Sequence, residues 1–139
     1  MRLMADYAHL LPDGRLAQGS APSPRVRLPF DVVVLAAEEY QPDLPGYPVV
    51  MHVPLDDGPP PDRDTRRRIR SAAQEVAEHV RLGHRVLVTC WQGRNRSGVI
   101  AGLALVRLGV PRERAVRRIQ RLRDGLRNPY FRAMVQGAF

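Results

Sequence analysis

The chain has 139 residues, one cysteine and a net charge of +8, so we expect one domain, residues 1–139, that forms without an intramolecular disulfide. A domain of this length buries about two thirds of the surface that its unfolded chain exposes, which is enough for a hydrophobic core. All 22 basic residues are arginine, and this excess of positive charge favours anionic partners.

The same composition argues against membrane and secreted classes. The longest apolar stretch, residues 98–106, is far shorter than the roughly 20 residues that a transmembrane helix needs. Asp6 interrupts the N-terminal segment before any apolar run of the length found in a signal peptide. We therefore expect a cytoplasmic protein with no membrane partner.

In chain order, strands dominate the first part of the sequence and helices the second. Apolar runs and turns predict two short strands within residues 7–19, joined by a turn at residues 12–14, and further strands at residues 30–37, 48–55 and 85–90. Helical spacing and capping residues predict helices between Asp62 or Asp64 and Gly83, from about Ser97 to Leu108, from Pro111 to Gly125, and after Asn128.

The order of these elements predicts the fold class. The longer strands are continuous apolar runs, which is typical of strands covered on both faces. Strands 48–55 and 85–90 are joined through a helix, a connection that permits parallel pairing. We predict an α/β fold, a single domain with a mixed central β-sheet flanked by helices and a cysteine loop between a strand and a helix.

The only cysteine lies in the segment VTCWQGRNRSG, residues 88–98, between a predicted strand and a predicted helix. Open α/β sheets bind ligands at this position, and the backbone N–H groups of such a loop attract anions together with the helix N-terminus. Gly93 would allow the loop to turn, and Arg96 could bind two phosphate oxygens. The candidate phosphate-binding residues are Trp91, Gln92, Gly93, Arg94, Asn95 and Arg96.

Cys90 lies at the base of this candidate anion site. The positive surroundings would stabilise its thiolate, and a thiolate that faces a bound phosphate is placed for in-line attack. Composition alone would supply the arginine, the glycine and the hydroxyl residue at these spacings about once in two thousand. We therefore favour a nucleophile over a buried filler thiol for Cys90.

The pattern Cys90-x5-Arg96-Ser97 resembles the signature of the cysteine-dependent phosphatases, and the small size of the chain points to their dual-specificity group. Further segments are similar to elements of that family, namely LAQGSA (16–21), FDVVVLAAEE (30–39), VPLDD (53–57) and the segment 128–131. The resemblance covers nearly the whole chain, although only the cysteine loop is specific by itself.

The resemblance implies a role for each matching residue. Cys90 would form a thiophosphoryl intermediate, Arg96 and the loop amides would bind the phosphate, and Ser97 would help the thiolate to leave. An aspartate on a separate loop would be the general acid and base, which the VPLDD match assigns to Asp57 with Asp56 as the alternative. The implied substrates are phosphomonoesters, above all phosphotyrosine, phosphoserine or phosphothreonine in proteins or peptides, with no cofactor and no metal.

The loop departs from the family pattern at three positions. Thr89 stands where the family has a histidine that organises the loop, so either the Cys90 thiolate loses support or Thr89 supplies a substitute hydrogen bond. Trp91 and Arg94 are a bulky and a basic residue that would shape the mouth of the pocket.

Other functions fit parts of the same pattern. The segment 93–97 is similar to the G-x-N-R-T of RNA 5′-triphosphatases, and a basic surface suits RNA, so an RNA 5′-phosphatase is one alternative. A catalytically silent phosphate- or RNA-binding module is another alternative, and rhodanese-like sulfur transfer fits less well.

The arginines within residues 66–68 and 112–123 are expected mostly on solvated helix faces. The four histidines have no metal-ligand spacing.

Overall fold

In the computed structural model, which describes residues 6–138, five strands form one mixed sheet in the order β1-β2-β5-β3-β4. These strands are β1 (Tyr7–His9), β2 (Leu16–Gly19), β3 (Val32–Ala37), β4 (Val49–Leu55) and β5 (Val86–Thr89). β1 pairs antiparallel with β2, whereas β2, β5, β3 and β4 are parallel to their neighbours. The predicted mixed sheet is therefore confirmed.

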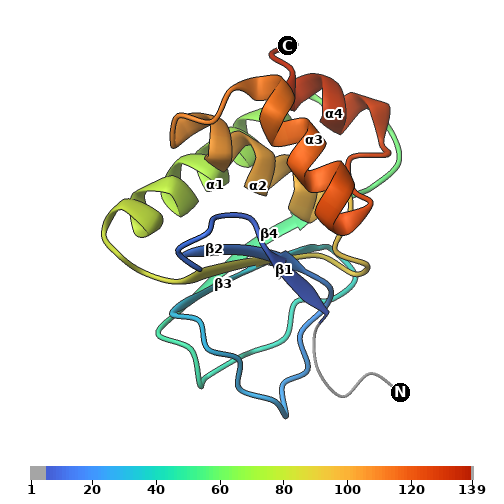
Figure 1. Ribbon diagram of the computed structural model, residues 1–139. Coiled ribbons are helices and arrows are strands. Elements are labelled where there is room, and N and C mark those ends of the chain that lie inside the picture. The colour runs from blue at the N-terminus through green and yellow to red at the C-terminus, as the bar shows by residue number, and fades with distance from the viewer. Residues whose placement is uncertain (1–5, 139) are drawn as a thin grey trace.

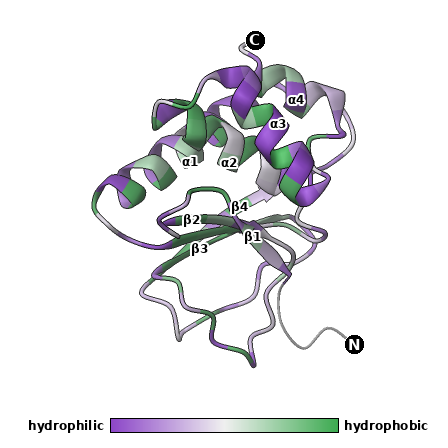
Figure 2. Cartoon of the chain, in the orientation of Figure 1, coloured by the Kyte–Doolittle hydropathy of each residue, from purple (hydrophilic) through white to green (hydrophobic). Residues whose placement is uncertain are grey.

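Helices cover one face of this sheet and long loops cover the other (Figure 1). The helices are α1 (Arg63–Arg81), α2 (Arg96–Arg107), α3 (Arg112–Arg123) and α4 (Pro129–Val135). On the loop side, Phe30 and Tyr47 pack with sheet residues that face away from the helices. Both faces of the central strands β3 and β5 are thus buried, which is why their sequences are continuously apolar. Figure 2 shows the sheet as mainly hydrophobic and many residues along α3 as hydrophilic.

Two details of the sheet and of α1 refine the sequence predictions. β4 was predicted to be covered on both faces, but it lies at the edge of the sheet, where His52 and Pro54 are exposed. Asp62, rather than Asp64, caps α1, because its carboxylate accepts a hydrogen bond from the Thr65 N–H at 2.8 Å.

The end of α3 also differs from the prediction. Pro111 is the N-cap of this helix rather than its first residue, and Asp124, with φ +52°, ends it one residue before the predicted Gly125. Glycine is required at 125 for a different reason, since a methyl group there would lie 2.7 Å from the Arg94 carbonyl oxygen. This close contact sets the turn after α3 directly behind the cysteine loop.

The predicted single domain, residues 1–139, includes residues 1–5 and 139, which lie outside the described part of the chain. Within residues 6–138, no helix combines the length and the apolar composition that crossing a membrane would require.

Candidate active site

The cysteine loop lies at the carboxyl end of β5, between the central strands and the N-terminus of α2. β5 is buried throughout its length, and Cys90 directly follows it with only 4% of its surface exposed. A pocket of about 250 Å³ opens above this residue. Its lining comprises Asp57, Cys90, Trp91, Gln92, Arg94, Asn95 and Arg96. The structure thus brings most of the predicted site residues together.

The backbone carbonyls of this loop turn away from the pocket and accept hydrogen bonds from behind. The Gly93 carbonyl accepts from Arg123 Nε at 3.2 Å, and the Arg94 carbonyl accepts from the Leu126 N–H at 3.1 Å. The Trp91 carbonyl accepts from the Ala21 N–H, the Gln92 carbonyl from Arg123 Nη2, and the Asn95 carbonyl from the Val99 N–H.

The orientation of these carbonyls fixes the direction of the neighbouring N–H groups. In a planar trans peptide the N–H of one residue points opposite to the preceding C=O. The N–H groups of residues 92 to 96 therefore face the pocket, and no acceptor from residues 6–138 bonds them there. Such a ring of donors at a helix N-terminus is suited to an anion with several oxygens.

Arg96 presents one edge of its guanidinium group to an internal partner and leaves the other for a ligand. Its two terminal nitrogens bind the two carboxylate oxygens of Glu39, with Nη2 at 2.8 Å, and Nη1 also donates to the Leu55 carbonyl at 3.1 Å. Arg96 Nε is buried and has no partner among the described residues. Nε and the second Nη2 hydrogen can therefore bind two oxygens of one phosphate.

Glu39 keeps this arginine in place. The hydrogen bonds from Arg96 outweigh partial burial and lower the pKa of the Glu39 carboxyl to about 2. The carboxylate is therefore charged at neutral pH and holds the guanidinium side-on to the pocket. Glu39 is the second residue after β3, in the segment that the sequence matched only as a strand.

Asp57 is held over the pocket through both of its carboxylate oxygens. Asn95 Nδ2 donates to one oxygen at 3.1 Å, and Asn128 Nδ2 donates to the other at 3.0 Å. Asp56 is exposed and does not line the pocket. Of the two candidates for the acid, only Asp57 is placed beside Cys90.

Ser97 and Thr89 lie on either side of Cys90 in the chain but differ in what they contact. Ser97 Oγ is 3.2 Å from Cys90 Sγ, so the predicted partner of the thiolate is within hydrogen-bond distance. Thr89 Oγ1 donates to the Val34 carbonyl at 2.7 Å. The hydroxyl proton of Thr89 is thus used inside the sheet, so of the two alternatives given above the substitute bond from Thr89 to Cys90 does not form.

Comparison with known proteins finds similar solved structures but no match to a protein-family model and no significant match to a curated protein. Among solved structures, a mouse putative dual specificity phosphatase complexed with zinc tungstate is 26% identical, with a TM-score of 0.75 over 94% of this chain and 84% of that one. Human DUSP28 is 24% identical, with a TM-score of 0.77 over 94% and 90%. Tk-PTP in its active form is 25% identical, with a TM-score of 0.74 over 98% and 95%.

The chain has the dual-specificity phosphatase fold. This confirms the resemblance and the fold class that the sequence predicted. In this dual-specificity phosphatase fold, Gly93 has φ +72°, and a methyl group there would lie 2.5 Å from the Gly19 carbonyl oxygen. The loop therefore rests directly on the end of β2, and only glycine allows that contact.

Four supporting residues of this phosphatase fold were not identified as site residues from the sequence. They are Gln18, Glu39, Arg123 and Asn128. Arg123 was expected on a solvated face, yet its side chain is 7% exposed and pairs with Asp6 at 3.1 Å. Helical spacing could have indicated it, because Arg123 follows the buried Ile119 by four residues. Gln18 carried a weaker signal, a polar side chain inside an apolar strand.

Trp91 adds one aromatic side chain to the lining of the pocket. Trp91 is 47% exposed, and its ring meets the ring of Tyr40 edge-to-face with centroids 5.8 Å apart. The Tyr40 hydroxyl donates to the Pro22 carbonyl, and burial raises the pKa of Tyr40. Gln92 and Arg94, from the same loop, are exposed and also line the pocket.

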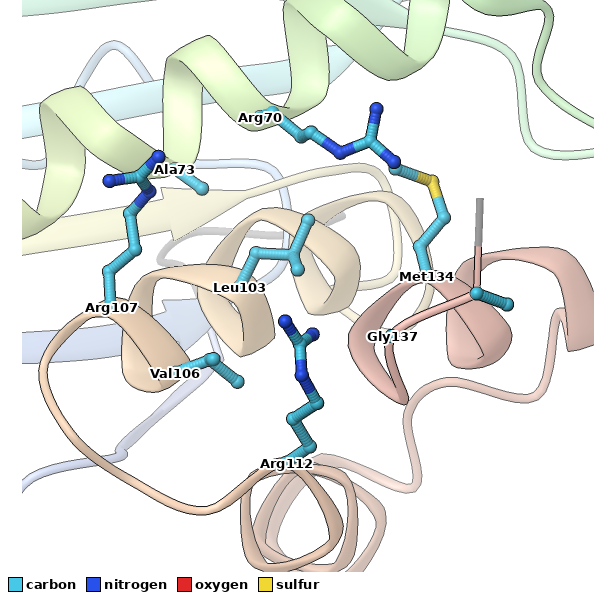
Figure 3. A pocket seen from close by; sticks show the side chains of 9 residues that line it. Arg70, Ala73, Leu103, Val106, Arg107, Arg112, Met134 and Gly137 are labelled. Atoms are coloured by element: carbon cyan, nitrogen blue, oxygen red, sulfur yellow. The ribbon is translucent and has the colours of Figure 1, made fainter.

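Two other features lie apart from this site. A hollow of about 270 Å³ between α1, α2 and the C-terminal segment has an apolar floor and an arginine rim, and no acid or nucleophile is among its described lining residues (Figure 3). They are Arg70, Ala73, Leu103, Val106, Arg107, Arg112, Met134, Gly137 and Ala138. The Nδ1 atoms of His79 and His84 are 2.9 Å apart, but within residues 6–138 no group of three metal-ligating side chains gathers.

Proposed function

We propose that the chain is a cysteine-dependent phosphatase that hydrolyses phosphomonoesters, with phosphotyrosine, phosphoserine or phosphothreonine in proteins or peptides as substrates. One observation carries the proposal. Cys90 shares its pocket with a ring of inward N–H groups, the unpaired edge of Arg96 and the carboxylate of Asp57. These are the nucleophile, the anion site and the proton carrier that phosphoryl transfer requires.

In the first step the Cys90 thiolate attacks the phosphorus atom in line with the ester oxygen. The S–P bond forms as the P–O bond breaks, and Asp57 gives its proton to the leaving oxygen, so that an alcohol or phenol departs. The loop N–H groups and Arg96 stabilise the charge that develops on the three other phosphoryl oxygens.

In the second step a water molecule attacks the phosphocysteine. The Asp57 carboxylate takes a proton from the water, the new P–O bond forms and the S–P bond breaks, which releases inorganic phosphate. The Ser97 hydroxyl, 3.2 Å from the sulfur, donates to the departing thiolate. Apart from the attacking water, both steps use groups of the chain itself.

The surroundings of the pocket support a protein substrate. Trp91 lines the pocket and is 47% exposed, so an aromatic side chain stands where the phenyl ring of a bound phosphotyrosine would lie. A nucleophilic Cys90 also works best in a reducing compartment, which supports the expected cytoplasmic location. Asp57 beside the nucleophile favours this function over the RNA 5′-phosphatase alternative, which by resemblance would not need that acid. A silent binding module would have no use for it either.

A hydrolysis assay with p-nitrophenyl phosphate tests the proposal. We expect wild-type protein to turn this ester over and Cys90→Ser to lose at least about a thousandfold in kcat, because the nucleophile is gone. Gln74→Ala changes an exposed residue of α1 that does not line the pocket, so it is the control and should keep full activity. Equal rates for wild type and Cys90→Ser would exclude an enzymatic role for the cysteine. Phosphopeptide binding without turnover would instead favour the silent module.

A further inference from the structure

We propose that Gln18 is a positioning residue that directs the Ser97 hydroxyl toward Cys90 and so supports the thiolate. The proposal deepens the proposed function, since it rests on Cys90 being the nucleophile. Gln18 belongs to β2, and its side chain is fully buried behind the cysteine loop. Its amide nitrogen lies 3.1 Å from Ser97 Oγ, 3.2 Å from the Gly93 carbonyl and 3.3 Å from the Arg94 carbonyl.

The orientation of the Gln18 amide follows from these neighbours. Two of them are carbonyl oxygens, which only accept hydrogen bonds. The opposite orientation would place the amide oxygen against both carbonyls, whereas the observed one leaves Oε1 buried without a partner among the described residues. An unpartnered buried oxygen costs free energy, so the contacts of the Nε2 group outweigh that cost.

The Gln18 amide sets the direction of the Ser97 hydroxyl proton. Ser97 Oγ accepts hydrogen bonds from Gln18 at 3.1 Å and from the Cys90 thiol at 3.2 Å. A thiolate at Cys90 has no proton to donate, so in that state the Ser97 proton, which the Gln18 amide excludes from its own side of the hydroxyl, donates to the sulfur. Accepting one hydrogen bond also polarises the hydroxyl and strengthens its donation to a charged sulfur. Ser97 is fully buried, so water does not compete for this proton. Gln18, Ser97 and Cys90 thus form a relay in which each donor points toward the thiolate.

A purely structural role for Gln18, in which its amide only holds the loop carbonyls, does not explain its contact with Ser97. The Gly93 carbonyl keeps a second donor in Arg123 Nε, and the Arg94 carbonyl keeps the Leu126 N–H. Ser97 Oγ has no donor other than Gln18 and the Cys90 thiol among the described residues. Loss of the amide would therefore leave the loop carbonyls bonded and the Ser97 hydroxyl undirected.

Alkylation of the single cysteine by iodoacetamide tests this relay, because the rate follows the thiolate fraction at Cys90 alone. We expect Gln18→Met, which keeps the side-chain volume, to move the pH midpoint of alkylation upward by about one pH unit. Thr89→Val is the matched control. It removes a buried hydroxyl next to Cys90 that bonds to Val34, and it should leave the midpoint unchanged.

A double-mutant cycle with Ser97→Ala separates the relay from a general effect on the fold. We expect Gln18→Met to shift the midpoint in the wild-type background and not in the Ser97→Ala background, because Gln18 acts through the hydroxyl. Equal shifts in both backgrounds, an unchanged midpoint in Gln18→Met, or a similar shift in Thr89→Val would overturn the proposal. If Gln18→Met fails to fold by circular dichroism, Gln18→Asn, whose amide is too short to reach Ser97, is expected to give the same shift.

This test does not depend on turnover. Should wild type and Cys90→Ser hydrolyse p-nitrophenyl phosphate equally, the proposed function would fail while the alkylation profile still reported on Gln18. Should Gln18→Met alkylate like wild type in an active phosphatase, the relay alone would fail.

Discussion

At the scale of single residues, the site depends on amide side chains that fix the direction of charged ones. Asn95 holds Asp57 with its Nδ2, and its Oδ1 accepts hydrogen bonds from the backbone N–H groups of Arg127 and Asn128. Asn128 in turn caps α4 with its Oδ1 and donates to Asp57 with its Nδ2. The position of Asp57 is therefore set by the cysteine loop and by the start of α4 together.

This arrangement assigns the acid role to one of two adjacent aspartates. We expect Asp57→Asn to lower kcat on a phosphoserine peptide by about a hundredfold, because the alkoxide leaving group needs a proton. The loss on p-nitrophenyl phosphate, whose leaving group is already stable as an anion, should be smaller. Asp56→Asn is the matched control and should retain wild-type rates on both substrates. Steady-state kinetics that showed the larger loss in Asp56→Asn would reverse the assignment.

At the scale of secondary-structure elements, Arg96 joins the ends of three of them. It is the first residue of α2, it binds Glu39 just after β3, and it donates to the carbonyl of Leu55 at the end of β4. The same side chain that faces the phosphate thus also ties α2 to the sheet. The stability of this junction and the geometry of the anion site are coupled through one guanidinium group.

The ion pair between Arg96 and Glu39 makes stability depend on acid pH. The pKa of Glu39 is lowered from 4.5 to about 2, so the stabilisation is fully present above pH 4.5 and is lost as pH falls through about 2. Because Glu39 is half-exposed, we expect a contribution of only about 1 kcal/mol. Urea unfolding of wild type and Glu39→Gln should differ by this amount at pH 7 and converge near pH 2.

The neighbouring Glu38 offers the control for that measurement. Glu38→Gln removes the same charge from an exposed side chain and should leave the unfolding free energy close to that of wild type. A constant difference between wild type and Glu39→Gln from pH 7 to pH 2 would show that the charge of Glu39 contributes nothing to stability.

At the scale of the whole molecule, the charge is strongly unbalanced. The net charge is +8, and Arg114, Arg117, Arg118 and Arg121 gather along one surface of α3. Near the pocket, Arg94 is exposed. A field of one sign raises the rate at which anionic substrates meet the protein, and salt screens it.

This charge predicts a preference that depends on ionic strength. For a phosphotyrosine peptide flanked by acidic residues, we expect kcat/KM to fall severalfold between roughly 0.02 and 0.3 M salt. The same peptide with glutamine in place of those acids should lose much less, because fewer charges are screened. An equal salt response of the two peptides in initial-rate assays would mean that the arginine surface does not steer substrates.

Much of this fold was accessible from local patterns. Valine-rich runs, helical spacing and capping residues placed the strands and helices, and the errors were confined to element ends and to the exposure of β4. Whether a strand lies at the edge of a sheet depends on the strand order, which no local pattern contains. The end of α3 was misplaced by one residue because Asp124 adopts the left-handed conformation and Gly125 instead serves a contact with Arg94.

The sequence by itself determined the cysteine loop, because the spacing of Cys90, Gly93, Arg96 and Ser97 within a few residues carries the chemistry of an anion site. Only the tertiary structure decided which distant side chains hold that loop. Gln18 meets Ser97 across 79 residues, Glu39 meets Arg96 across 57, and Asn128 meets Asp57 across 71. These contacts depend on strand order and on helices packed over the sheet. The polar Gln18 inside an apolar strand marked an unusual residue, but no local pattern could name its partner. The nucleophile could thus be read from the sequence, whereas the groups that aim it could not.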